Sequence, residues 1–377
     1  MASDSGGTGT FADSPAVAVA VAACVRARLA ALPLADRIGQ LMVVGVPISA
    51  PTQGTGVVRG VRAGGVFLHG RSSQSVDVVA RGIGALQASA GLAGLLPLQV
   101  TADQEGGQIQ ALSGPGFPAM PSAVVQGSWA ATRLQDTTRT WATALVRAGV
   151  TWNLAPVADT VPADKLDQNQ PIGHYQREFG TTPAAVGDDV VTVVGASRSA
   201  GLLTTVKHFP GLGRVTDNTD TSATASDPVT TTGDPYLQPF ARGIAAGSSA
   251  VMISSATYPL LDATHPAVFS PAVIQGLLRG TLGYDGLVIS DDLSMAVAVQ
   301  SVPAGQRAVQ FLAAGGDVVL TVRAAEATPM YQALLAAAKG GSAFRARVDR
   351  SVSRVLTEKI HAGLLPCDGF IKTVATG

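Results

Sequence analysis

Eight short apolar runs, separated by longer stretches of helical character, place the strongest constraint on how this chain can fold. The runs cover residues 41–47, 64–70, 96–103, 150–157, 202–209, 250–255, 286–292 and 317–323. They are almost continuously hydrophobic, as parallel strands buried on both faces are. Helices are expected between and after them, at 73–89, 124–147, 182–200, 235–246, 270–280, 303–314, 325–338 and 341–361.

This alternation predicts a single α/β domain, a closed (β/α)8 TIM barrel, and 377 residues are enough to build one. An open doubly wound sheet would need a GxGxxG turn after its first strand, and residues 45–56 do not supply one. We expect the barrel domain to span residues 14–377. Residues 1–13 are rich in Gly, Ser and Thr and are interpreted as a disordered remnant of an N-terminal linker.

The composition narrows the function. The formal net charge is +0, which removes the electrostatic argument for nucleic acid or an anionic membrane as partner. A run of eighteen apolar residues is lacking, so no transmembrane segment is expected. The five histidines and two cysteines show no metal-ligand spacing, and neither metal nor cofactor is predicted. A small neutral ligand such as a sugar is compatible with this composition.

Polar residues stand at the ends of five of the expected strands. In chain order they are Asp103, Asn153, Asp159, Lys207, His208, Ser254, Ser255, Asp291 and Asp292. Active sites of TIM barrels lie at the C-terminal ends of the strands. Charged residues within apolar runs are costly to bury unless they are paired or used. The spacing therefore predicts one polar pocket at the barrel mouth.

Five sequence motifs give this pocket a chemistry. They are DQEGGQIQ (103–110), NLAPVADT (153–160), IGHYQREFG (172–180), KHFPGLG (207–213) and SDDLSM (290–295). Together they resemble glycoside hydrolase family 3, and within it the single-domain bacterial β-N-acetylglucosaminidases and the actinobacterial lipoproteins related to them. The resemblance runs in order from about residue 35 to 360 and implies a TIM barrel that hydrolyses glycosides with retention.

The resemblance assigns Asp291 as the nucleophile, which would form a glycosyl-enzyme that water later cleaves. An Asp after a strand also commonly caps the next helix, and Asp292 is expected to fill that role. Asp103 matches an acid that binds sugar hydroxyls; its alternative is a turn residue. Arg177 matches an arginine that contacts the glycan, with a surface salt bridge as the alternative.

Lys207 and His208 match residues that hydrogen-bond the sugar beside the cleaved bond. The alternative for His208 is a core histidine with satisfied hydrogen bonds. As neighbours on a strand, the two side chains are expected to point to opposite faces.

The chain departs from the family pattern at the proton donor. The family's loop after the fifth strand ends in a catalytic histidine oriented by an aspartate two residues earlier, whereas ungapped counting places Asp220 and Asn218 there. Leu212 replaces a second histidine, and Gln108 replaces an arginine after the EGG motif. We predict Asp220 as the acid/base, in a loop that folds over the sugar. The alternative is that Asp220 only shapes a turn.

Asp217 and His174 are the other candidate proton donors. Three functions remain open. The first is a retaining exo-β-N-acetylhexosaminidase that releases terminal GlcNAc, with MurNAc as a further candidate, from cell-wall glycans. The second is another family 3 activity, a β-glucosidase or a glycoside phosphorylase. The third is a sugar-binding protein whose acid/base catalysis is impaired.

Cys24 and Cys367 stand near opposite ends of the chain, which a barrel brings together. They are either two buried thiols or a disulfide, and a disulfide would indicate an oxidising compartment. Cys24 also ends a VAAC sequence that resembles a lipobox, but no positive charge precedes it. We expect a monomeric, secreted or envelope-attached enzyme, whose export signal or lipid anchor has been removed from this sequence.

Overall fold

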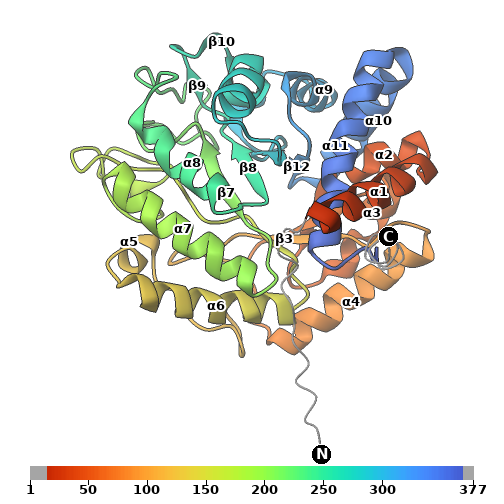
Figure 1. Cartoon of the computed structure of the whole chain (residues 1–377), viewed down its shortest axis with the longest axis horizontal. Helices are drawn as coiled ribbons and strands as arrows, with labels where there is room; N and C mark the ends of the chain where they lie inside the picture. Colours follow the sequence, from red (N-terminus) through yellow and green to blue (C-terminus); the bar gives the residue numbers. More distant parts are fainter. Residues whose placement is uncertain (1–14, 368–377) are drawn as a thin grey trace, which may run out of the picture.

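The computed structural model describes residues 15–367, which form a ring of strands surrounded by helices (Figure 1). The eight barrel strands are β1 (Met42–Pro47), β2 (Gly65–His69), β3 (Gln99–Ala102), β6 (Trp152–Asn153), β7 (Thr205–Phe209), β8 (Ala250–Ile253), β11 (Leu287–Ser290) and β12 (Val319–Thr321). Each lies within one of the eight predicted runs. The segments 1–14 and 368–377 lie outside the described residues, and so does the linker predicted for residues 1–13.

Hydrogen bonds between the strands close the ring. One sheet has the order β12-β1-β2-β3-β6 and the other the order β11-β8-β7, with all pairs parallel. The two sheets meet on one side through parallel bridges that join residues 152 to 203 and 157 to 207. On the other side, residue 289 bridges to residue 318. The eight strands therefore follow one another around a (β/α)8 barrel, as predicted.

The helices form the outer layer. They are α1 (Pro15–Ala31), α2 (Leu34–Gln40), α3 (Thr55–Gly60), α4 (Val76–Leu92), α5 (Ala123–Gln126), α6 (Ala131–Arg147), α7 (Pro183–Ser199), α8 (Gln238–Ala245), α9 (Ala304–Ala314), α10 (Ala324–Gly340), α11 (Ser342–His361) and the π-helix η5 (Ala272–Thr281). Within residues 15–367 none of them combines the length and apolar character needed to cross a membrane.

Two predicted helices differ from the structure. The helix predicted at 124–147 is divided into α5 and α6; Gly127, just after α5, lies against the carbonyl oxygen of Phe179, where a Cβ atom would have no room. The helix predicted at 270–280 is present, but its turns are π-helical. Two short hairpins were not predicted, β4 (Gln104–Gly106) with β5 (Ile109–Gln110), and β9 (Thr257–Tyr258) with β10 (Asp262–Pro266).

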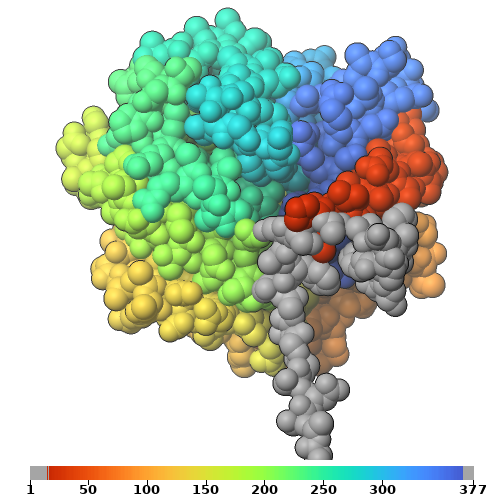
Figure 2. Space-filling view, in the orientation of Figure 1, coloured from red at the N-terminus to blue at the C-terminus, as the bar shows by residue number. Residues whose placement is uncertain are grey.

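A disulfide joins the first helix to the end of the described chain. Helix α1 packs beside α11, so the beginning and end of the described chain are neighbours (Figure 2). Cys24 of α1 forms a disulfide with Cys367, with their Cα atoms 6.0 Å apart. Of the two possibilities left open by the sequence, the disulfide is the one present. Because its sulfur is bonded, Cys24 does not act as an acylated lipobox cysteine.

Lys359 of α11 is fully buried, and its ammonium group has no carboxylate partner among the described residues. Its Nζ atom donates to Gln40 Oε1 at 2.6 Å and to the Pro97 carbonyl oxygen at 2.7 Å. Burial lowers the pKa of Lys359 to about 7. A buried charge without a counter-charge is costly, so the protonated form weakens the fold.

We expect this lysine to make stability depend on pH. Between pH 7 and its ordinary pKa near 10.5, the unfolded state binds the proton and the folded state does not, so stability rises with pH by about 1.4 kcal/mol per unit. The substitution Lys359→Met should remove this slope. Urea unfolding of both proteins at pH 7, 8 and 9 measures it, and equal slopes would contradict the prediction.

Candidate active site

Buried and half-buried charges gather at the C-terminal ends of the barrel strands. Asp103 directly follows β3, and Glu105 lies in the adjoining hairpin strand β4. Lys207 and His208 lie in β7, and Asp291 directly follows β11. Together with Arg177, which lies on the connection after β6, they occupy one mouth of the barrel, as TIM-barrel architecture predicts.

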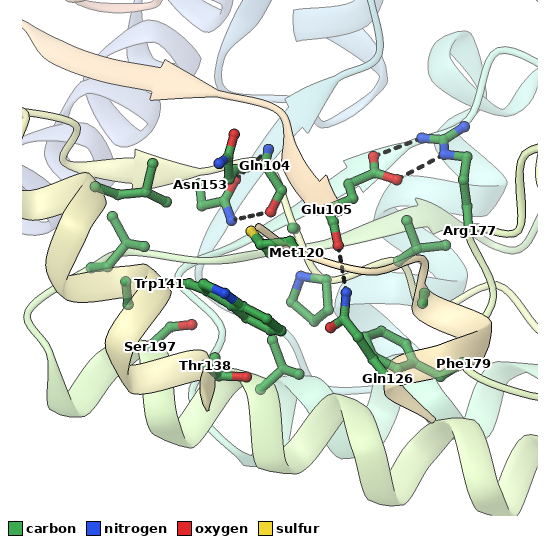
Figure 3. Close-up of a pocket in the computed structure, with 18 residues that line it drawn as sticks. Gln104, Glu105, Met120, Gln126, Thr138, Trp141, Asn153, Arg177, Phe179 and Ser197 are labelled. Carbon is green, nitrogen blue, oxygen red and sulfur yellow. Dashed lines mark hydrogen bonds and ion pairs between the residues drawn. The ribbon is translucent and has the colours of Figure 1, made fainter. Parts of the chain in front are cut away.

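Glu105 is the centre of this cluster. Its carboxylate accepts two hydrogen bonds from the Arg177 guanidinium, both at 2.8 Å (Figure 3). Lys207 Nζ lies 2.7 Å from Glu105 Oε1 and 2.6 Å from Asp103 Oδ1. Burial by itself would raise the pKa of Glu105, but the Arg177 and Lys207 charges outweigh it and hold that pKa well below its usual range. Glu105, Arg177 and Lys207 therefore stay charged over the whole physiological range.

His208 is held from behind by Asp159. The Asp159 carboxylate is fully buried and lies 2.7 Å from His208 Nδ1. It also accepts the backbone N–H groups of His208 and Leu212. This leaves His208 Nε2 facing the mouth, 3.4 Å from Arg177 Nη2. A ring nitrogen bound by a carboxylate fixes the orientation of the imidazole.

One prediction about these residues is wrong. Lys207 and His208 do not separate to opposite faces, because both side chains reach the Glu105–Arg177 pair. The register of β7 against β8 shifts between Val206 and Phe209, which interrupts the regular alternation of the strand.

The two consecutive aspartates after β11 have different surroundings. The Asp292 carboxylate accepts hydrogen bonds from the backbone N–H groups of Ser294, Met295 and Val322, so it caps the turn that follows the strand. Asp291 accepts only the N–H of Asp292, at 2.8 Å, among the hydrogen bonds of the described chain. The Asp291 carboxylate is thus the less engaged of the two and half-buried at the mouth.

Asp220 reaches the same mouth from the loop after β7. The residue is exposed, but its carboxyl group is partly shielded from water by the mouth, and this desolvation, together with the nearby Asp291 charge, raises the pKa of Asp220 to about 6. Arg177 and His208 oppose this shift, so both lie near enough to act on Asp220. A carboxyl group with a pKa near 6 is partly protonated at neutral pH, as a general acid must be.

The other two candidate donors have different environments. Asp217 Oδ2 accepts hydrogen bonds from Ser222 and Thr224, at 3.1 and 3.2 Å, and shapes the loop. His174 is exposed, with its ring edge-on to Tyr175. Asn218 Oδ1 accepts the backbone N–H of Asp220 at 2.9 Å, so it fixes the main chain of the loop beside the acid.

A cavity lies below the mouth, between the barrel wall and the helices α5, α6 and α7 (Figure 3). It is lined mainly by apolar side chains, among them Trp141, Met120 and Phe179. Gln126 closes one side by donating to the Glu105 carbonyl oxygen at 2.9 Å. Glu105 and Arg177 line this cavity, but Asp291 and Asp220 do not. The cavity is therefore separate from the reacting groups.

Two important residues were given no individual role by the sequence, although Asp159 was counted among the polar residues of the predicted pocket. Glu105 lies within the quoted DQEGGQIQ motif, and a glutamate directly before two glycines could have indicated a site residue. Asp159 ends an apolar stretch, VADT, and is completely buried; that position could have indicated a positioning role. In the part of the chain described, no group of three His, Cys, Asp or Glu residues could hold a metal ion.

Comparisons with known proteins agree with this geometry. The model of the glycosyl hydrolase family 3 N-terminal domain matches residues 33–358. A crystal structure of β-N-acetylhexosaminidase from Beutenbergia cavernae is similar, with a TM-score of 0.84 and 42% identity, over 86% of this chain and 98% of that one. β-Hexosaminidase LpqI from Mycobacterium tuberculosis is 31% identical over 331 residues, 86% of this chain and 82% of that protein.

A third similar protein is the family 3 β-N-acetylglucosaminidase from Paenibacillus, with a TM-score of 0.80 and 29% identity, over 92% of this chain and 68% of that one. The barrel and its mouth thus define a TIM-barrel enzyme of the glycosidase class. The chain belongs to glycosyl hydrolase family 3.

We expect Glu105→Gln to weaken both the fold and the site. The change removes one anion that faces two buried cations, and breaking a buried ion pair typically costs about 3–5 kcal/mol. The matched control is Asp136→Asn, which breaks an exposed pair with Arg139 and should cost less than about 1 kcal/mol. Urea unfolding at pH 7 measures both, and equal effects would contradict the central place given to Glu105.

Proposed function

We propose that this protein is a retaining exo-β-N-acetylhexosaminidase that releases terminal GlcNAc from cell-wall glycans such as peptidoglycan fragments, with MurNAc as a second sugar. The names of the similar proteins support the sugar class. The observation that carries the proposal is the pair of carboxyl groups at the mouth, where Asp291 raises the pKa of Asp220 across the pocket. Such a pair is what retaining hydrolysis requires.

In this proposal Asp291 is the nucleophile and Asp220 is the acid/base. Asp291 attacks the anomeric carbon while the Asp220 proton passes to the leaving oxygen, so the glycosidic bond breaks as the glycosyl-enzyme bond forms. Asp220, now ionised, then takes a proton from water, which attacks the anomeric carbon and releases Asp291. The pKa of Asp220 should fall once the Asp291 charge is neutralised by the covalent bond, which suits its change of role from acid to base.

The charged cluster would bind the sugar. Asp103 keeps one oxygen free of the Lys207 bond and can accept a sugar hydroxyl. Lys207, His208 and Arg177 can donate to sugar oxygens from fixed positions, because Glu105 and Asp159 hold them. Preorganised donors lose little entropy on binding and keep the anomeric carbon in line with Asp291.

We also propose that the protein acts as a monomer outside the cytoplasm, secreted or attached to the cell envelope. The Cys24–Cys367 disulfide supports this location, since disulfides persist in oxidising compartments.

The substrate class can be tested with 4-nitrophenyl β-glycosides. We expect kcat/KM for the GlcNAc glycoside to exceed that for the glucose glycoside by at least about tenfold, the ratio for a difference of 1.4 kcal/mol in transition-state binding. Asp291→Asn should abolish turnover of both, and a 2-fluoro sugar should label Asp291. Equal kcat/KM values would favour a β-glucosidase, and labelling of Asp292 would refute the assignment of the nucleophile.

The proton donor can be tested through leaving groups and pH. Asp220→Ala should lose about 10²–10⁴-fold in kcat/KM on a GlcNAc disaccharide, the usual contribution of a general acid. The kcat/KM for a dinitrophenyl glycoside, whose leaving group needs no proton, should stay near the wild-type value. Azide, which needs no base to attack the glycosyl-enzyme, should restore turnover. Because the acid must be protonated, wild-type kcat/KM on the disaccharide should fall above pH 6, and the variant should lack this decline. Wild-type rates on the disaccharide in Asp220→Ala would exclude Asp220.

A further inference from the structure

The loop that carries Asp220 has an anchor at its base that the reaction itself does not explain. The loop leaves the barrel after Phe209, at the end of β7, and returns at the short helix η3 (Pro235–Leu237). Asp220 lies at the middle of its most exposed part. Arg214 lies on the part of the loop before Asp220, here called the outgoing arm. Its side chain contacts the part after Asp220, the returning arm.

The Arg214 guanidinium binds the returning arm at several points. It donates to Asp234 Oδ2 at 2.7 Å and to Asp227 Oδ2 at 3.3 Å, and a further hydrogen bond goes to Thr230. Its central carbon lies 4.2 Å from the centre of the Tyr236 ring. A planar guanidinium can make all these contacts together, whereas a lysine ammonium cannot. Arg214 thus clamps the two arms together.

The acceptors of this clamp are themselves fixed. Asp227 is buried and also accepts the backbone N–H groups of Val229 and Thr230. Asp234 caps η3 through the N–H of Tyr236 at 2.9 Å. The Arg214 contacts therefore join the outgoing arm to a returning arm that is itself bound to β9, since the Asp227 N–H donates to the Thr257 carbonyl oxygen at 2.9 Å.

Two further contacts hold the loop against the mouth. The buried Asn169, from the connection that also carries Arg177, donates to the carbonyl oxygens of Leu212 and Val215, both at 2.7 Å. The carbonyl oxygen of Thr219 accepts the N–H of Ala298, from the segment after Asp291, at 3.1 Å. The part of the loop that precedes Asp220 is thereby tied to both neighbouring loops.

We propose that Arg214 is a positioning residue that clamps the loop in its closed form, so that Asp220 stays beside Asp291 before substrate binds. This inference rests on the proposed role of Asp220 as proton donor. In this protein the loop that carries the acid/base is held in place before substrate binds. Substrate binding therefore does not have to supply the free energy of closing the loop. Arg214 has no part in the chemistry; it acts only through the place it gives to Asp220.

Leaving-group dependence tests the clamp. In Arg214→Met, we expect kcat/KM on a GlcNAc disaccharide to fall by about 100-fold, since a displacement of about 1 Å at a catalytic group has effects of that size. The dinitrophenyl glycoside should change little, because its cleavage does not need Asp220. Arg214→Lys keeps the positive charge but loses the several simultaneous guanidinium contacts. Its kcat/KM on the disaccharide should lie between those of the wild type and Arg214→Met.

A double-variant cycle separates positioning from general destabilisation. If Arg214 acts through Asp220, then Arg214→Met should cost nothing further on the disaccharide in an Asp220→Ala background. The matched control is Arg242→Met, which breaks an Arg–Asp pair with Asp188 between the outer helices α7 and α8. It should leave both substrates unaffected. If Arg214→Met fails to fold, Asp234→Asn serves instead, because it keeps the cap on Tyr236 and loses the ion pair.

The proposal is overturned if Arg214→Met slows both substrates equally or slows neither, or if its effect persists in the Asp220→Ala background. These results leave the proton donor itself untouched. If Asp220→Ala alone shows no leaving-group dependence, the proposed function of Asp220 fails instead, so the two failures are distinguishable.

Discussion

The paired charges around Glu105 determine how the mouth of this barrel is built. One buried carboxylate joins the hairpin after β3 to Arg177 on the connection after β6 and to Lys207 in β7. Removing these ions from water costs several kcal/mol each, and only close pairing with full hydrogen bonding recovers it. This pairing holds Arg177, Lys207 and Asp103 in fixed positions at the mouth, where the proposed function places the sugar.

Much of the barrel could be predicted because its strands are buried on both faces. That requirement forces runs such as VMIS and LVIS to be apolar almost without interruption, and such runs are visible in the sequence. The elements that were not predicted depend on contacts between distant residues or are too short to show a periodic pattern. The division between α5 and α6 occurs where Gly127 packs against Phe179, a residue far away in the sequence that periodicity cannot reveal. The hairpin β4–β5 has strands of three and two residues, too short for any periodicity.

The site was predictable to the extent that it follows from strand ends. Asp103, Lys207, His208 and Asp291 could be placed at the mouth because each stands at a strand end and all strand ends of a barrel share one mouth, whereas their roles stay predictions. The roles of Glu105 and Asp159 depend on side chains far apart in sequence, Arg177 and His208, whose positions a pattern cannot give. The path of the loop around Asp220 was equally hidden, since it is set by single contacts of Asn169, Arg214 and Ala298.

The proposal that Asp220 acts where the family has a histidine explains why such contacts would matter. A histidine has an ordinary pKa of about 6.5 and can donate a proton near neutral pH wherever its loop happens to be. An aspartate in water has a pKa of about 3.9 and can donate only if burial and a neighbouring negative charge raise it. Asp220 obtains both conditions from its position, with the Asp291 charge beside it. If the loop moved outward, the two conditions would vanish together, and the carboxyl group would lose its proton as well as its place. A carboxylate donor on a loop therefore requires the loop to be held, whereas a histidine donor tolerates motion. In this proposal, the contacts of Arg214 and Asn169 supply the restraint that a carboxylate donor needs.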